Sequence, residues 1–103
     1  MIAGKMGSDI VLLDLTGITI IADYFIIATG DSDRQLKAIA DELQEKLKTD
    51  LDIQILTEEG APSSGWILLD YGNIVVHLFS ETMRNRYQLE LLWQDAKTLV
   101  KVA

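Results

Sequence analysis

The sequence predicts an α/β (α+β) domain in which a five-stranded mixed sheet packs with helices. Three observations predict it: apolar runs of strand length, a helix with a clear N-terminal cap, and a hairpin of alternating residues around Gly72-Asn73. The chain has 103 residues, of which 49% are hydrophobic and only one is a proline, so it can bury one sizeable core. We therefore expect residues 1–103 to form a single domain.

Two apolar strands are expected first. Residues 9–15 and 23–29 are apolar runs of strand length. The first run ends at Thr16-Gly17 and the second at Gly30, and both are turn signals. We expect both runs to be strands of the sheet.

The first helix is expected to begin at Ser32. Ser32 and Gln35 have the spacing of a capping box. One apolar face then follows at helical spacing, formed by Leu36, Ile39, Ala40, Leu43 and Leu47. Asp31 and Asp33 have the alternating spacing of Mg²⁺ or Ca²⁺ ligands, but acidic residues in a first turn more commonly complement the helix dipole. We interpret these two residues as part of the helix start.

Three more strands and a second helix are expected to follow. Residues 53–56 are predicted to form a brief strand, residues 57–65 a polar loop, and residues 66–80 a hairpin. Ser80 suits the N-cap of a second helix. The apolar face of that helix is expected to contain Leu89, Leu92, Trp93, Ala96, Leu99 and Val100.

Alternation divides the predicted hairpin into two faces. A two-residue turn at Gly72-Asn73 places Tyr71 opposite Ile74. The core face then contains Ile67, Leu69, Tyr71, Ile74, Val76 and Leu78. The other face is amphipathic and contains Trp66, Leu68, Asp70, Val75, His77 and Phe79.

The residue types disfavour an active site on the amphipathic face. Asp70 and His77 lie diagonally across the two strands, and the pattern implies no serine or cysteine nucleophile beside them. A lone histidine on an apolar strand is more often a packed residue than an acid–base group. One histidine and no cysteine also disfavour a zinc site. We expect no catalytic residue, no metal ligand and no cofactor.

The net charge of −7, from nine Lys and Arg against sixteen Asp and Glu, disfavours direct binding to nucleic acid. It favours encounter with a basic protein partner, although acidity also serves solubility alone. No apolar run is long enough to span a membrane, and residues 1–8 do not resemble a signal peptide. The absence of cysteine fits a reducing compartment, so we expect a cytoplasmic protein.

A set of aromatic and basic residues favours a protein-docking surface, because such side chains dominate binding hot spots. Its members are Tyr24, Trp66, Tyr71, Arg84, Arg86, Tyr87 and Trp93. Trp93 is expected in the core instead, because it lies in the apolar face of the second helix.

Five segments, read in order over residues 9–96, resemble the ribosomal silencing factor family, whose members are also called Iojap-like proteins. These segments are DIVLLDL, ADYFIIATG, S-x-RQ-x-x-AIAD, WILLDYGNIVVHLF and R-x-x-Y-x-LE-x-LW. The resemblance implies a fold like that of nucleotidyltransferases without their catalytic acids. It also implies a translational repressor rather than an enzyme. Such a protein binds the large ribosomal subunit through the basic ribosomal protein numbered fourteen and sterically blocks association with the small subunit.

The resemblance also implies partner-binding residues, all within its matching motifs. They are Asp23, Tyr24, Trp66, Asp70, Tyr71, Arg84 and Tyr87. Trp66 and Tyr71 are expected to be the anchors, and Asp70 the charge complement of a lysine or arginine.

The sequence departs from the family pattern before its first strand. Residues 1–8 are too short and too rich in glycine for the helix that members usually have there, so that helix is expected to be short or absent. An exposed sheet face or a homodimer would follow. Two alternative functions remain at this stage: an Mg-dependent nucleotidyltransferase-like enzyme using Asp31 and Asp33, and a self-associating interaction domain.

Overall fold

The computed structural model describes residues 8–20 and 22–102. The expected absence of an N-terminal helix concerns residues that lie outside this part of the chain. A six-stranded sheet has the order β3-β4-β5-β2-β1-β6. Its strands are β1 (Ser8–Asp14), β2 (Tyr24–Gly30), β3 (Thr57–Ala61), β4 (Trp66–Asp70), β5 (Ile74–Ser80) and β6 (Lys97–Val102). The helices are α1 (Asp33–Leu51), the short 3₁₀ helix η2 (Pro62–Ser64), α2 (Glu81–Tyr87) and α3 (Leu89–Leu92).

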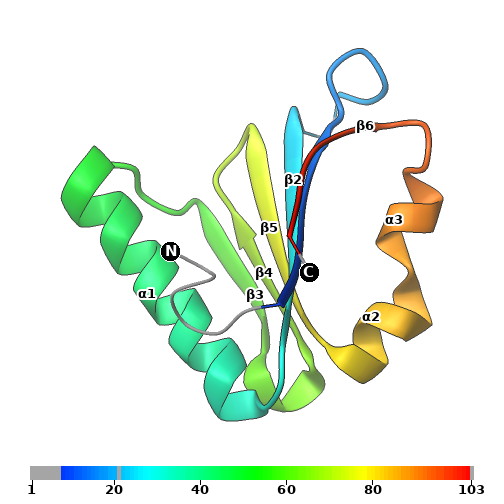
Figure 1. The fold of residues 1–103 in the computed structure, drawn as a ribbon. Coiled ribbons are helices and arrows are strands. Elements are labelled where there is room, and N and C mark those ends of the chain that lie inside the picture. The colour runs from blue at the N-terminus through cyan, green and yellow to red at the C-terminus, as the bar shows by residue number, and fades with distance from the viewer. Residues whose placement is uncertain (1–7, 21, 103) are drawn as a thin grey trace.

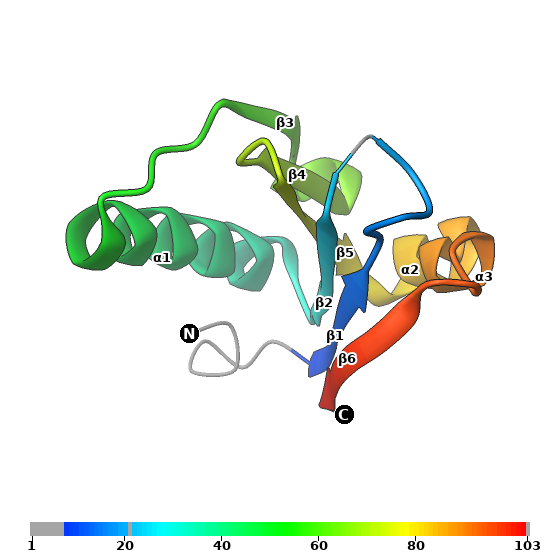
Figure 2. The ribbon, with the colours of Figure 1, turned by 90° about the horizontal axis from the view of Figure 1, so that it is seen from above.

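The sheet lies between two helical layers. Helix α1 packs on one face, and α2 and α3 pack on the other (Figures 1 and 2). β2 and β5 run parallel, whereas the other neighbouring pairs are antiparallel. The predicted class, a mixed sheet packed with helices, is confirmed, with six strands in place of the predicted five.

Each face of the sheet has its own hydrophobic cluster. The α1-side cluster consists of Ala28, Leu36, Ile39, Ala40, Leu43, Ile67, Leu69, Val76 and Leu78. The α2-side cluster consists of Val11, Leu13, Leu15, Ala22, Phe25, Ile27, Val75, Phe79 and Ala96. Because β2 and β5 alternate between the two clusters, they are the most deeply buried strands of the sheet.

The predicted start of the first helix is confirmed. Ser32 is the N-cap, and its Oγ accepts a hydrogen bond from the backbone N–H of Gln35 at 3.1 Å. The side chain of Gln35 returns to the backbone N–H of Asp31, one residue before the cap. Asp33 lies in the first turn, as expected of an acid that complements the helix dipole.

The predicted hairpin is also confirmed. Tyr71 donates its backbone N–H to the Ile74 carbonyl at 2.9 Å, so these residues flank a two-residue turn. The register places Trp66 opposite Phe79 and Leu68 opposite His77, as alternation predicts. The face containing Ile67 and its neighbours joins the α1-side cluster.

The predicted strand at 53–56 is wrong, because the strand lies in the segment expected to be a loop. The Ile53 backbone N–H closes the end of α1 by donating to the Leu47 carbonyl at 2.9 Å. The strand that pairs with β4 is β3, which begins at Thr57, and all its residues are exposed. An edge strand needs no apolar side chains to make its hydrogen bonds, so hydrophobicity did not reveal it.

The predicted single helix through residue 100 is also wrong. Gln88 has a left-handed backbone (φ 48°) that separates α2 from α3, and Lys97–Val102 form β6 instead of continuing a helix. β6 pairs antiparallel with β1. Of the predicted apolar face, Ala96 is buried, whereas Leu92, Leu99 and Val100 are exposed.

Candidate docking site

The second face of the hairpin is mostly core rather than an open docking surface. Val75 and Phe79 are buried in the α2-side cluster, and His77 between them is only 5% exposed. Trp66 and Leu68, nearer the sheet edge, remain half-buried. The free part of this face is therefore the strip along β4.

His77 fixes the indole ring of Trp66. The Nε1–H of Trp66 donates to Nδ1 of His77 at 3.3 Å, which requires this imidazole nitrogen to be unprotonated. Phe25 meets the imidazole edge-on with ring centroids 4.7 Å apart, and Phe79 stacks parallel to it. Burial lowers the pKa of His77 from 6.5 to about 4, so the ring is neutral at physiological pH. The interpretation of His77 as a packed residue fits this geometry.

Trp66 and Tyr87 form the floor of a shallow groove. Their ring centroids lie 4.7 Å apart, and Trp66 also contacts Phe79 at 5.0 Å. The groove has a volume of about 350 Å³ and is lined by Glu59, Gly60, Ser64, Trp66, Leu68, Met83 and Tyr87. We call it the Trp66 groove. Tyr87 is 46% exposed, so part of the aromatic floor is open to a partner.

Two glycines bring the walls of this groove together. At Gly60 (φ +83°) a Cβ atom would lie 2.1 Å from the Trp66 carbonyl oxygen, so β3 can approach β4 only without a side chain there. At Gly65 (φ +77°) a Cβ would lie 2.7 Å from Met83 Cγ and from Ser80 Oγ. Gly60 therefore lets β3 approach β4, and Gly65 lets α2 begin against the start of β4.

Four of the predicted contact residues lie at the turn end of the sheet, far from Trp66 at the other end of β4. Asp70 uses Oδ1 to accept from the Gly72 backbone N–H at 2.7 Å, which stabilises the turn. Asp23 is exposed, and the backbone N–H groups of Asp23 and Tyr24 both donate to the Asn73 carbonyl. This end of the sheet is thus held together by the turn.

Tyr71, the other predicted anchor, is half-buried and packs against the α1-side cluster. Its hydroxyl is buried and has no hydrogen-bond partner among residues 8–20 and 22–102. The pKa of this hydroxyl is raised mainly by burial and to a lesser extent by the nearby carboxylate of Glu58. The side chain is therefore on the opposite face of the sheet from Trp66.

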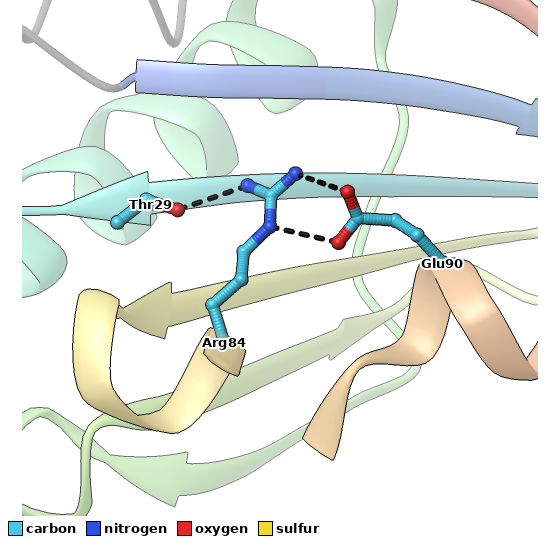
Figure 3. Close-up of polar contacts among 3 residues, drawn as sticks. All are labelled: Thr29, Arg84 and Glu90. Carbon is cyan, nitrogen blue, oxygen red and sulfur yellow. Dashed lines mark hydrogen bonds and ion pairs between the residues drawn. The ribbon is translucent and has the colours of Figure 1, made fainter. Parts of the chain in front are cut away.

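Arg84 follows Met83 in α2, and its guanidinium points toward Thr29 and Glu90 (Figure 3). Nε and Nη2 donate to the two carboxylate oxygens of Glu90 at 2.9 and 3.0 Å. Nη1 donates to Oγ1 of the buried Thr29 at 2.9 Å. Only 10% of the Arg84 side chain is exposed, so the observed contacts join α2 to α3 and β2.

The structure therefore separates the predicted contact residues instead of gathering them. Trp66 and Tyr87 share the groove, Arg84 is internal, and Asp23, Tyr24, Asp70 and Tyr71 lie at the turn end. Glu59, on the groove wall, was absent from the sequence-based candidates because its segment was interpreted as a loop.

Within 8–20 and 22–102, no group of three or more His, Asp or Glu side chains could hold a metal ion. No helix in the same part of the chain is both long and apolar enough to cross a membrane. The fold and the groove together define a small mixed α/β domain with an aromatic groove on one face of its sheet.

Comparison with known sequences identifies the family. The profile described as "Ribosomal silencing factor during starvation" matches residues 1–103. The chain is 44% identical over 92 residues to the Bacillus subtilis protein named "Ribosomal silencing factor RsfS", covering 89% of this chain and 77% of that protein. It is also 40% identical over 76 residues to "Protein Iojap-related, mitochondrial" of Arabidopsis thaliana, covering 70% of this chain and 41% of that protein. The chain belongs to the ribosomal silencing factor family, as the sequence motifs predicted.

Comparison with solved structures supports the same fold. A crystal structure of a Chromobacterium violaceum protein superposes with a TM-score of 0.84 at 38% identity, covering 99% of this chain and 86% of that one. A Bacillus halodurans structure gives a TM-score of 0.79 at 36% identity, covering 96% and 89%. The family profile and the Bacillus subtilis relative are both named for ribosomal silencing, which is a regulatory role and not an enzymatic one.

Proposed function

We propose that this protein represses translation by binding the large ribosomal subunit on the face that meets the small subunit. Membership of the ribosomal silencing factor family is the observation that carries the proposal. The docking partner is the basic ribosomal protein fourteen. A mouse relative is named "Mitochondrial assembly of ribosomal large subunit protein 1", and its name also refers to this subunit.

The mechanism is steric and needs no chemical step. The described chain measures 33 × 32 × 23 Å, large enough to keep two flat surfaces apart when one of them holds it. An interface of ordinary size, about 800 Å² on each partner, provides specific binding. The net charge of −7 favours encounter with a basic protein.

The Trp66 groove is the proposed centre of the docking surface. Trp66 and Tyr87 supply aromatic area with little conformational entropy to lose, which is typical of binding hot spots. Asp23 and Tyr24 at the turn end are proposed as peripheral contacts. The protein is proposed to act in the cytoplasm, in keeping with its bacterial relatives.

Co-sedimentation with purified large subunits at moderate salt tests this proposal. The wild-type chain is expected to sediment with large subunits. Tyr87→Ala removes an exposed groove ring and should weaken binding by about tenfold or more, whereas the peripheral Asp23→Ala should weaken it by about threefold or less. A wild-type chain that stays in the supernatant would overturn the function. A Tyr87→Ala variant that folds and binds normally would overturn the placement of the site.

A further inference from the structure

The edge strand β3 brings one carboxylate to the Trp66 groove and directs its neighbour away. Glu59 lies opposite Leu68 in the antiparallel β3–β4 pair, and directly opposed residues share a face, so Glu59 is on the groove side. Glu58 is on the other face, where its Oε1 accepts from Nε2 of Gln44 in α1 at 3.0 Å. Two adjacent, exposed glutamates therefore have different surroundings.

The carboxylate of Glu59 is available to a partner. It is exposed, and it forms no hydrogen bond or ion pair with the residues that the structure describes. Beside it, Trp66, Leu68, Met83 and Tyr87 form an apolar and aromatic floor. The groove thus combines one negative charge at its wall with an apolar floor, and it is large enough to hold one side chain.

We infer that the Trp66 groove takes the side chain of a single lysine or arginine of the partner, with Glu59 as the residue that selects its charge. This inference rests on the proposed function and specifies the chemistry of that same site. The methylene stem of the basic residue packs on Trp66 and Tyr87, while its cationic head pairs with Glu59. An arginine fits best, because a guanidinium can stack on an aromatic face and bind a carboxylate through two hydrogen bonds.

Other occupants fit the groove less well. A purely apolar side chain would bury the Glu59 carboxylate without a partner, which costs free energy. An acidic side chain would be repelled by Glu59 and by the negative charge of the whole chain. Asp70, the charge complement expected from sequence, lies at the far end of β4 from Trp66 and already binds the turn.

A pair of charge reversals on adjacent residues tests the inference. Glu59→Lys should weaken binding to purified large subunits by about tenfold or more, because it places a like charge against the incoming cation. The matched control is Glu58→Lys, which makes the same change one residue away on the other face and should change affinity by about twofold or less. The isosteric Glu59→Gln should give an intermediate loss that shrinks at high salt.

A second measurement does not depend on the ribosome. A short Gly/Ser peptide with one central arginine, at millimolar concentration, should shift the NMR signal of the Trp66 indole N–H. The same peptide with glutamine in place of arginine, or the Glu59→Gln protein with the arginine peptide, should give a much smaller shift. Equal losses for Glu59→Lys and Glu58→Lys, or an equal response to both peptides, would overturn the inference. Loss of binding on Tyr87→Ala would still support the proposed function in that case.

Discussion

At the scale of single residues, His77 and Trp66 form one unit. Nδ1 of His77 accepts the indole N–H, and the imidazole is enclosed by Phe25 and Phe79. The imidazole must stay neutral at Nδ1 to accept this hydrogen bond. His77 therefore stabilises the ring that we place at the centre of the docking surface.

The buried His77 predicts a specific pH dependence of stability. Burial lowers its pKa from 6.5 to about 4 in the folded protein, whereas the unfolded chain keeps the ordinary value. Unfolding therefore takes up a proton between these pH values, and the free energy of unfolding should fall as pH drops through this range. The full loss from this residue is about 3 kcal/mol, from about 1.4 kcal/mol for each pH unit. Urea denaturation at a series of pH values measures it.

The control for this prediction is His77→Asn. An asparagine can place an acceptor near the position of Nδ1 but does not titrate, so its stability should fall less between pH 7 and pH 4 than that of the wild type. Acidic residues contribute to both curves, and the difference between the curves isolates His77. Parallel curves would contradict the account.

Alternation predicted which hairpin residues face each side, because a two-residue turn fixes the register. Alternation placed Trp66 on the amphipathic face, and the family resemblance implied its role as an anchor. Glu59 could not be found, because its orientation depends on an edge strand formed by the polar sequence TEEGA. The family resemblance implied Arg84 as a contact residue, but a sequence does not show that its guanidinium reaches Glu90 and Thr29.

At the scale of elements, the confirmed predictions are those with strong local signals. Helix α1 has a serine cap and a regular apolar face, and the β4–β5 hairpin has its turn residues. The end of the chain lacked such signals. Leu89, Trp93 and Ala96 fit a helical period and do pack inward, but Gln88 interrupts the helix and β6 follows. The pairing of β6 with β1 is a long-range contact that a local pattern cannot predict.

Arg84 connects three of these elements, and its replacement by lysine should destabilise the fold. Lysine keeps the charge but cannot bind Glu90 with two hydrogen bonds while also reaching Thr29. A fully buried ion pair broken on one side costs about 3–5 kcal/mol. Because 40% of the Glu90 side chain is exposed, we expect about 2 kcal/mol for Arg84→Lys, measured by chemical denaturation.

Arg86→Lys is the matched control, since Arg86 is an exposed residue of the same helix. It should change the free energy of unfolding by about 0.5 kcal/mol or less. Binding to large subunits separates the roles of Arg84. If Arg84→Lys keeps its stability but loses binding, Arg84 contacts the partner and the structural account is wrong. If the variant is less stable but binds normally when folded, the structural role is supported.

At the scale of the whole molecule, the two faces of the sheet differ. On the α2 side, the helices do not cover the strip along β4, and this uncovered strip forms the Trp66 groove. On the α1 side, an apolar groove of about 540 Å³ lies between α1 and strands that include β1 and β2. The fold thus presents an aromatic groove with one carboxylate on one face and an apolar groove on the other.

The central claim is that this domain prevents subunit joining by occupying the large subunit. The most direct measurement is sucrose-gradient sedimentation of purified large and small subunits, mixed at a Mg²⁺ concentration that promotes joining. Prior addition of the wild-type chain should shift joined ribosomes to free subunits, with the chain in the large-subunit fractions, and Tyr87→Ala should do so much less. Joined ribosomes that form normally while the chain is bound to their large subunits would contradict the account.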